Sequence, residues 1–307
     1  MSSIEVRPFR RGDREQLTAL VNAHAAAVVP GISVSVNTVL SQLEGEPGEF
    51  IVGPWVAERA TLVAEQRQRV VAAANLLRYA AGDEVGESYR DAGEIQWFLY
   101  WPEAPYWPDS VEAADGLIAA CVAQLDRWRV VRQYAAGELP APGVYGVPEQ
   151  WPHIRAIYER AGFAHDGHTE IVYIANVDEL PRPGCPPVKG LSLHRSLGIN
   201  GTRLSAVLAD EVVGYIEVDT FEGAERLPRH GGWADFGNLR VVEQHRRRGI
   251  GTWLVGQAGD WLRLARVDRV LDYSWPEHED YTAFLGTVGF RELTRTKRGW
   301  VREIPER

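Results

Sequence analysis

The sequence has few cysteines and no long apolar run. Its 307 residues include only two cysteines, Cys121 and Cys185, too few for a disulfide framework or a cysteine-rich metal site. A transmembrane helix needs about 18 or more consecutive apolar residues, and no such run occurs. The opening residues, MSSIEVRPFRRGD, lack the apolar core of a signal peptide. We therefore expect a cytoplasmic protein without a membrane partner.

Lysine is also scarce, and the overall charge is negative. Lysine occurs only at positions 189 and 297, so the basic residues are almost all arginine. The formal net charge of −9 at pH 7 argues against nucleic acid as a general partner, because phosphate backbones are bound by excess positive charge. It favours a cationic acceptor such as an amine, although solubility alone would also account for it.

One basic, glycine-containing segment separates a predicted strand from a predicted helix. Residues 235–241, DFGNLRV, predict a short strand, and apolar residues at helical spacing predict a helix over 250–265. Between them lies RRRGIG at 246–251. The first N–H groups of a helix have no internal partner, and the helix dipole favours an anion there. Because glycines also let the backbone close around a diphosphate, the segment predicts an anion site.

This segment resembles the acyl-CoA-binding motif of the GNAT superfamily of N-acyltransferases. The family's strand ends in Val, an Arg or Gln follows five residues later, and x-x-Gly-x-Gly/Ala then opens a helix. Here Val241 is followed by Arg246, and then by Gly249 and Gly251. The competing phosphate motifs G-x-x-x-x-G-K-[ST] and G-x-G-x-x-G are absent from the sequence. The simpler alternative, a strand–turn–helix with a basic surface loop, leaves the clustering of Arg and Gly unexplained.

The resemblance implies acetyl-CoA, or another short acyl-CoA, as cofactor. It also implies that the strand backbone pairs with the pantetheine arm and polarises the thioester carbonyl, while the loop holds the diphosphate. The cofactor-binding residues that it implies are Leu239, Arg240, Val241, Arg246, Arg247, Arg248, Gly249, Ile250, Gly251 and Thr252.

Transfer to an amine also requires a general base, because an amine is protonated at neutral pH and must lose a proton before it attacks. Many family members supply this base as a carboxylate on the central strands. Asp235 shares strand parity with Leu239 and Val241 and is the first candidate. Glu217 and Asp219, on the preceding predicted strand, are the alternatives. The simpler interpretation of each is a surface carboxylate.

The leaving thiolate needs an acid, which many family members take from a Tyr on the helix after the fifth strand. Leu285 stands at that position, five residues before Phe290. Tyr281 lies four residues earlier on the same helix face and is the nearest substitute. Tyr273, at the end of the fifth predicted strand, is an alternative. For the nearby His278, a structural hydrogen-bonding role is the simpler interpretation.

The order of predicted elements repeats along the chain, and so does a Gly-Phe pair, at 162–163 and 289–290. We therefore expect an α/β (α+β) fold of two tandem GNAT-like domains, each a mixed central sheet flanked by helices. The first half predicts strands at 4–8, 50–58, 61–64, 69–78, 95–100 and 170–175 and helices at 14–27, 36–43, 111–128 and 151–163. The predicted boundaries are 1–177 for a degenerate N-terminal domain, 178–190 for a proline-rich linker and 191–307 for the C-terminal acetyl-CoA-binding domain.

The first half lacks the anion loop. Aligning the halves places residues 111–116, VEAADG, opposite 246–251, so that Glu112 and Asp115 would repel a diphosphate. We expect this half to bind acyl-CoA poorly or not at all. The second half has little room for the two helices that help wall the acceptor site in family members. We expect the first domain, or a second copy of the chain in a homodimer, to supply that wall.

The leading hypothesis is an N-acetyltransferase that moves an acetyl group from acetyl-CoA to an amine, most simply a small molecule. Attack would be direct, in a ternary complex, because no Cys or Ser stands out as an acyl carrier. The alternative is a non-catalytic acyl-CoA-binding sensor or scaffold, which Leu285 in place of the family's tyrosine favours. His165 and His168 have no third ligand nearby, so we expect no metal site.

Overall fold

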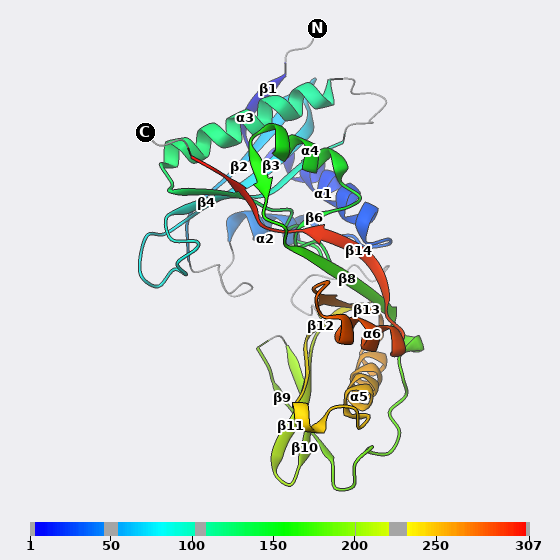
Figure 1. The fold of residues 1–307 in the computed structure, drawn as a ribbon. Coiled ribbons are helices and arrows are strands. Elements are labelled where there is room, and N and C mark those ends of the chain that lie inside the picture. Colours follow the sequence, from blue (N-terminus) through cyan, green and yellow to red (C-terminus); the bar gives the residue numbers. More distant parts are fainter. Residues whose placement is uncertain (1–3, 46–54, 102–108, 200, 221–231, 305–307) are drawn as a thin grey trace. The chain divides into compact units, whose positions relative to one another are not determined.

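The computed structural model of the chain forms two compact units, which we call unit 1 and unit 2. The described residues are 4–45, 55–101, 109–199, 201–220 and 232–304. Unit 1 contains Met1–Thr169 and Arg295–Arg307, and unit 2 contains Glu170–Thr294. Each unit is a mixed β-sheet flanked by helices, which confirms the expected fold class (Figure 1). In the described part of the chain, no helix has the length and apolar character needed to span a membrane.

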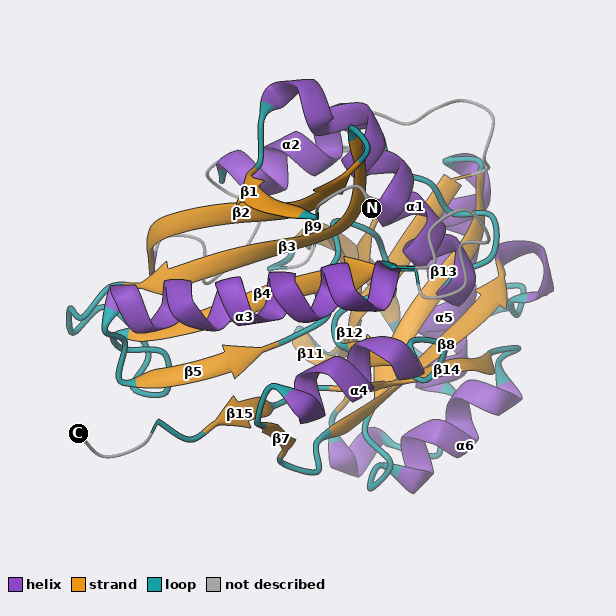
Figure 2. Ribbon diagram, turned by 90° about the horizontal axis from the view of Figure 1, so that it is seen from above, coloured by secondary structure: helices purple, strands orange, loops and turns teal. Residues whose placement is uncertain are grey.

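Unit 1 is built on a sheet with the strand order β1-β2-β3-β4-β5-β15-β7. Its strands are β1 (Glu5–Pro8), β2 (Val56–Gln66), β3 (Arg69–Tyr79), β4 (Ala92–Tyr100), β5 (Arg132–Ala135), β7 (Phe163–His165) and β15 (Trp300–Arg302). Its helices are α1 (Arg14–Val28), α2 (Val36–Glu44), α3 (Ser110–Trp128) and α4 (Pro152–Arg160). Helix α3 covers one face of this sheet (Figure 2), because Leu117, Cys121 and Leu125 recur at helical spacing and are buried.

Unit 2 is built on the strand order β14-β8-β13-β12-β11-β10-β9. Its strands are β8 (Thr169–Asn176), β9 (Ser192–Leu197), β10 (Thr202–Leu208), β11 (Glu211–Asp219), β12 (Gly232–Val241), β13 (Val267–Ser274) and β14 (Arg291–Lys297). Its helices are α5 (Ile250–Leu264) and α6 (Glu279–Thr287). Beyond unit 2, the last residues of β14 pair with β6 (Val147–Pro148) of unit 1. Only residues 198–201 join β9 to β10, where unit 1 has α1 and α2, so the expected lack of room for two helices is confirmed.

The closing strands of the two halves are exchanged. In unit 1, β15 comes from the end of the chain, and its Trp300 pairs with Ala135 of β5 and His165 of β7. In unit 2, β8 comes from the end of the first half and pairs with β13 (Figure 1). The expected boundaries, 1–177 and 191–307, kept each half contiguous and differ from these units. Apolar alternation predicts that a segment forms a strand, but it does not specify which sheet accepts that strand.

The proline-rich segment 178–190 belongs to unit 2 and packs along α5. The backbone N of Pro183 lies 3.0 Å from the position that a Cβ on Gly256 would take, and Leu180 lies 3.3 Å from that of Gly259. Leu180 is itself buried. The composition of this segment predicts a linker, but the buried leucine and the glycines of α5 fix it to the helix.

One expected hairpin is a single strand. The predicted strands at 50–58 and 61–64 are replaced by β2, and the part before residue 55 lies outside the described residues. The turn that joins β2 to β3 instead contains Arg67 and Gln68, with φ angles of 53° and 63°. Two-residue hairpin turns of this kind normally carry Gly, Asn or Asp, so this turn has no signal in the sequence.

Candidate functional site

Strands β12 and β13 run parallel and then separate, which opens one edge of β12. Their ladder runs from Gly232 with Val267 to Asp235 with Leu271, and the described pairing goes no further. A β-bulge at Gly237 follows directly, because Phe236 and Asn238 pair with successive residues of β11. A bulge bends its strand and increases the local twist, which carries β12 away from β13. The backbone of β12 beyond the bulge is therefore available to an extended ligand.

The chain returns from β12 to the start of α5 through a basic loop. Gly249 precedes the first residue of α5 with φ of 79°, a left-handed conformation that glycine adopts without steric cost. Arg246 donates through Nε to the carbonyl oxygen of Val241, 3.1 Å away, and so ties the loop to the end of the strand. Residues 246–249 are all exposed. The unpaired N–H groups at the start of α5 thus lie beside three exposed arginines, which is an arrangement suited to an anion.

The second glycine of the motif has a packing role. A Cβ on Gly251 would lie 3.3 Å from the ring of Phe284 on α6. That distance is tighter than ordinary van der Waals contact, so glycine lets α5 and α6 approach each other at this point. Gly249 has a similar neighbour, since its Cβ would lie 3.2 Å from Pro187.

The predicted cofactor residues come together at the end of β12 and the start of α5, in two groups. Leu239, Val241 and Ile250 pack into the apolar core of unit 2, so their side chains position the strand and the helix. Gly251 is half-buried beside them. The exposed members, whose atoms a ligand can reach, are Arg240, Arg246, Arg247, Arg248, Gly249 and Thr252.

The exposed arginines of the loop make only weak, solvent-exposed contacts with neighbouring side chains. Arg247 makes an ion pair of 3.2 Å with Asp280, and both side chains are largely exposed to solvent. Arg248 lies 3.2 Å from the Nδ1 atom of His245. Exposed contacts of this kind contribute little to stability and exchange readily for stronger ones. The loop can therefore redirect its positive charge toward a diphosphate.

Among the candidate bases, Glu217 is fully engaged by its neighbours. Its side chain is 0% exposed. Its Oε1 accepts from Nε of Arg203 at 2.8 Å and from the backbone N of Ile199 at 3.2 Å. Its Oε2 accepts from Nδ2 of Asn238 at 2.8 Å. Glu217 therefore links β10, β11 and the bulged part of β12 to one another and to the backbone of Ile199, which follows β9.

Asp235 lies at the point where the strands separate. It is the last residue of β12 that pairs with β13, and it stands opposite Asp219 of β11. Its side chain is 7% exposed. Ala234 and Phe236 on either side pack into the core beneath α5. Because side chains alternate along a strand, Asp235 faces the other side of the sheet, which α5 and α6 do not cover.

Tyr281, the candidate acid, is hydrogen-bonded to a carboxyl group that sequence reasoning missed. Its hydroxyl donates to Oδ2 of Asp272 on β13 at 2.8 Å. Burial raises the pKa of the Asp272 carboxyl to about 7. Burial and this carboxyl together raise the pKa of Tyr281 as well. Leu285, at the position of the family's tyrosine, is completely buried. The strand at 267–274 carries two carboxylates, Asp268 and Asp272. Only Asp272 directly follows two consecutive apolar residues, Val270 and Leu271, and that position is the signal that could have identified it.

The other candidates lie at the margin of this arrangement. Tyr273 is half-buried and packs with Leu271 on the opposite face of β13 from Asp272. His278 is exposed and immediately precedes α6. In the described part of the chain, no three His, Cys, Asp or Glu side chains come together as a metal site requires.

Unit 1 repeats the separation of strands but closes the opening with its own chain. Ala92 to Ile95 of β4 pair with β5, and a bulge at Gln96 follows. Beyond β5, the N–H of Ala136 donates to the carbonyl of Ile95 at 2.8 Å, and that of Glu138 donates to the carbonyl of Gln96 at 3.0 Å. Every residue of β4 is buried. The edge that is open in unit 2 is thus occupied in unit 1.

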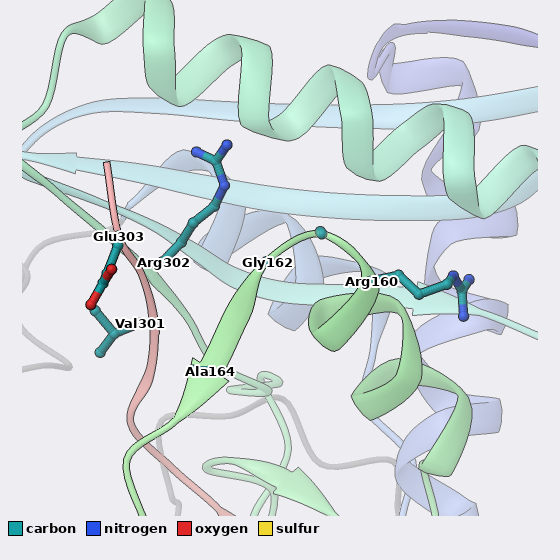
Figure 3. A pocket seen from close by; sticks show the side chains of 7 residues that line it. Arg160, Gly162, Ala164, Val301, Arg302 and Glu303 are labelled. Carbon is teal, nitrogen blue, oxygen red and sulfur yellow. The ribbon is translucent and has the colours of Figure 1, made fainter. Parts of the chain in front are cut away.

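A pocket of about 450 Å³ lies elsewhere in unit 1, between the end of α4, β7 and the exchanged strand β15 (Figure 3). Its two arginines extend away from each other and are already engaged. Arg160 pairs with Asp115 at 2.8 Å, and Arg302 donates to Gln133 at 2.7 Å. Both arginines of this pocket are therefore held by other side chains and not directed at a ligand.

Comparisons with known proteins agree with this geometry. Residues 172–299 match the family described as acetyltransferase (GNAT) family. No curated protein matches the chain. A solved tandem GNAT protein from the clavulanic acid biosynthesis pathway is 16% identical with a TM-score of 0.67, over 99% of this chain and 100% of that one. A GCN5-related N-acetyltransferase from Sphaerobacter thermophilus is 13% identical with a TM-score of 0.57, over 97% and 94% of the two chains. At these identities the structures establish a shared fold.

Proposed function

We propose that this chain transfers an acetyl group from acetyl-CoA to an amine. The match of residues 172–299 to the acetyltransferase (GNAT) family supports acyl transfer from acyl-CoA. One observation carries the proposal. The open edge of β12 leads directly into a basic loop and the exposed start of α5 in unit 2. A ligand with an extended arm and a diphosphate matches both features. The acetyl group, the amine and a cytoplasmic location are parts of this proposal.

The residues present fit an acyl-CoA. Backbone groups of β12 from Gly237 to Arg240 would pair with the pantetheine arm, since the ladder with β13 has ended. The N–H groups at Gly249 to Thr252 and the side chains of Arg246 to Arg248 would hold the diphosphate. The bound thioester supplies an activated acyl group. The protein contributes its orientation and hydrogen bonds from the strand to the carbonyl oxygen.

We assign proton removal from the amine to Asp235. Glu217 is completely buried and both of its oxygens accept hydrogen bonds, one of them from Arg203, so an amine cannot reach its carboxylate. Asp235 also lies beside the point where β12 becomes open, on the sheet face that α5 and α6 leave uncovered. An amine that approaches from that face would meet the carboxylate before it reached the thioester. Tyr281, on the opposite face, is the proposed donor to the leaving sulfur.

The proposed acceptor is a small molecule that carries a primary amine. The negative net charge of −9 favours a cation and argues against nucleic acid. Unit 2 has no described helices between β9 and β10, so its own elements leave the acceptor side open. We propose that unit 1 or a second copy of the chain completes it, with no membrane partner involved.

Calorimetric titration of the full chain with acetyl-CoA tests the cofactor site. We expect saturable binding to the wild type and none to Arg246→Glu/Gly249→Glu, because both substitutions place negative charge at the start of α5. Arg291→Glu, an exposed residue of β14, is the matched control and should bind normally. Absence of binding to the wild type would overturn the proposal. Release of CoA thiol with a library of amines then tests transfer.

A second candidate is a non-catalytic acyl-CoA-binding sensor or scaffold. The buried Leu285 at the position of the family's tyrosine favours it, because that side chain carries no proton to donate. The two functions differ in one measurement. A sensor binds acetyl-CoA without releasing thiol in the presence of any amine, whereas an enzyme releases it.

A further inference from the structure

Asp272 is a buried carboxyl group at the point where the two central strands of unit 2 separate. The ladder between β12 and β13 ends at Leu271, so Asp272 is the first residue of β13 beyond it. Its side chain is 2% exposed. Carboxyl groups are rarely buried so completely unless a cation or several donors compensate for the lost hydration. The groups around Asp272 therefore show what compensates its carboxyl group for the lost hydration.

No cation compensates Asp272 among the described residues. Its Oδ2 accepts from the Tyr281 hydroxyl at 2.8 Å, and its Oδ1 accepts from the backbone N of Tyr273 at 2.7 Å. From β8, Tyr173 stands opposite it and directs its hydroxyl to Thr282. From β12, the nearest charged group is Asp235, which faces the other side of the sheet. Its hydrogen bonds therefore come from one tyrosine hydroxyl and one backbone amide.

The hydrogen-bonded pair of Asp272 and Tyr281 is linked by packing to the start of α5. The Tyr281 ring stacks on Phe284, with centroids 6.2 Å apart and planes at 21°. The Phe284 ring lies 3.3 Å from the position of a Cβ on Gly251. One aromatic ring thus separates Tyr281 from the helix start that would hold the diphosphate. Tyr281 is half-buried, so its side chain reaches both the core and the surface.

The protonation state of Asp272 decides what Tyr281 can do. An ionised Asp272 accepts the tyrosine proton in a hydrogen bond and keeps it on the phenol. A protonated Asp272 can instead donate to the phenol oxygen, which frees the tyrosine proton to point elsewhere. Burial favours the protonated form up to about neutral pH. Tyr281 alone is a weak acid, but the pair can pass on a proton from a much stronger one.

We propose that Asp272 and Tyr281 form a proton relay to the leaving sulfur, with Tyr281 as the donor and Asp272 as the residue that positions and recharges it. The inference rests on the proposed function. As the carbon–sulfur bond breaks, its electron pair stays on sulfur, which takes the Tyr281 hydroxyl proton. The Asp272 proton moves to the Tyr281 oxygen and leaves a carboxylate. Solvent returns a proton to Asp272 before the next turnover.

The first test needs neither cofactor nor turnover. Carbon NMR of the full chain labelled at aspartate carboxyl carbons should show one resonance that titrates near pH 7 and is missing from Asp272→Asn. Asp268→Asn, an exposed position on the same strand, is the matched control and should retain it. Tyr281→Phe should shift the resonance. If the Asp272 resonance titrates near the ordinary value of 3.8, the relay is wrong.

The second test separates the relay from the proposed function. Asparagine can still accept from Tyr273 and contact Tyr281, so Asp272→Asn should bind acetyl-CoA normally. Its turnover should fall by roughly 100-fold, and the loss of activity above about pH 7 that we expect of the wild type should disappear. Wild-type turnover and pH profile in Asp272→Asn would overturn the relay alone. Failure of the proposed function would appear in the wild type, as absent binding or transfer. If Asp272→Asn does not fold, Tyr281→Phe must show the same loss of turnover.

Discussion

Strand β4 in unit 1 and strand β12 in unit 2 both separate from a parallel neighbour, but only β4 has its edge covered beyond that point. Both pair with a parallel neighbour over a short ladder, and both bulge where the ladder ends. Beyond the bulge, β4 is buried under the chain that follows β5, whereas Gly237, Asn238 and Arg240 of β12 are exposed. The scaffold therefore does not by itself leave an open strand edge. The path of the chain after the fifth strand decides whether the opening remains.

The helices that follow these strands also differ, because only the start of α5 is suited to an anion. Helix α5 begins after a left-handed Gly249 and three arginines, whereas α3 carries Glu112 in its first turn. A carboxylate at a helix start competes with an anionic ligand for the same N–H groups. Unit 1 thus lacks both features of unit 2, the open strand edge and the helix start without a carboxylate.

The largest expected effect concerns the number of acetyl-CoA sites. Calorimetry of the full chain should give one site per chain, because the β4 edge in unit 1 is already hydrogen-bonded to residues 136–138. In Arg246→Glu/Gly249→Glu, binding should weaken by more than about 100-fold and so become undetectable by calorimetry. A residual site that survives the double substitution would show that unit 1 also binds the cofactor and would break the comparison.

A second effect should appear in the stability of unit 2. Arg203→Met leaves Glu217 buried without its cation, so we expect a loss of about 2 kcal/mol or more in the free energy of unfolding. This loss is smaller than that expected for a fully buried ion pair, because the Arg203 side chain is one-third exposed. Urea denaturation measures it, with Arg291→Met as an exposed control. An unchanged midpoint would show that Glu217 does not hold these strands in register.

A third effect concerns a buried carboxyl group of unit 1. Glu94 accepts a hydrogen bond from Tyr79, and burial raises its pKa from 4.5 to about 7. The folded state therefore holds this proton more tightly than the unfolded state. The resulting stability is fully present below pH 4.5 and is lost as the pH rises through 7.

Glu94→Gln should remove this dependence on pH. At pH 8 the free energy of unfolding of the variant should exceed that of the wild type by up to about 3 kcal/mol. At pH 4 the two free energies of unfolding should be equal. Glu87→Gln, at an exposed position, is the control. Equal stabilities of variant and wild type at both pH values would show that Glu94 does not retain its proton in unit 1.

The smallest expected effect is at the rim of the anion site. Arg247→Gln removes an exposed ion pair with Asp280, so the unfolding midpoint should not move measurably. Acetyl-CoA binding should weaken by roughly threefold, and the difference should shrink as salt is added. Calorimetry at two salt concentrations measures this. A large loss of binding would mean that Arg247 contacts the ligand more closely than its exposure suggests.

The parts of the site that sequence predicted are local. A strand, a loop with Gly249 at positive φ and a helix start follow one another within 20 residues, so the spacing of residues in the sequence was enough to predict them. Asp272 and Tyr281 meet across β13 and α6, and their contact depends on how the helix packs. The exchange of β8 and β15 depends on competition between two similar sheets. No pattern within a single strand records the outcome of that competition.

The exchanged strands also determine the order in which the two units can be completed during synthesis. Unit 2 is one continuous segment, Glu170–Thr294, whereas unit 1 needs residues from both sides of it. A ribosome that makes the chain from its N-terminus begins unit 1 first but can complete unit 2 earlier. Until residues 300–302 emerge, the sheet of unit 1 has a gap between β5 and β7. Unit 2, which we propose binds the cofactor, can therefore fold completely while unit 1 still lacks its last strand.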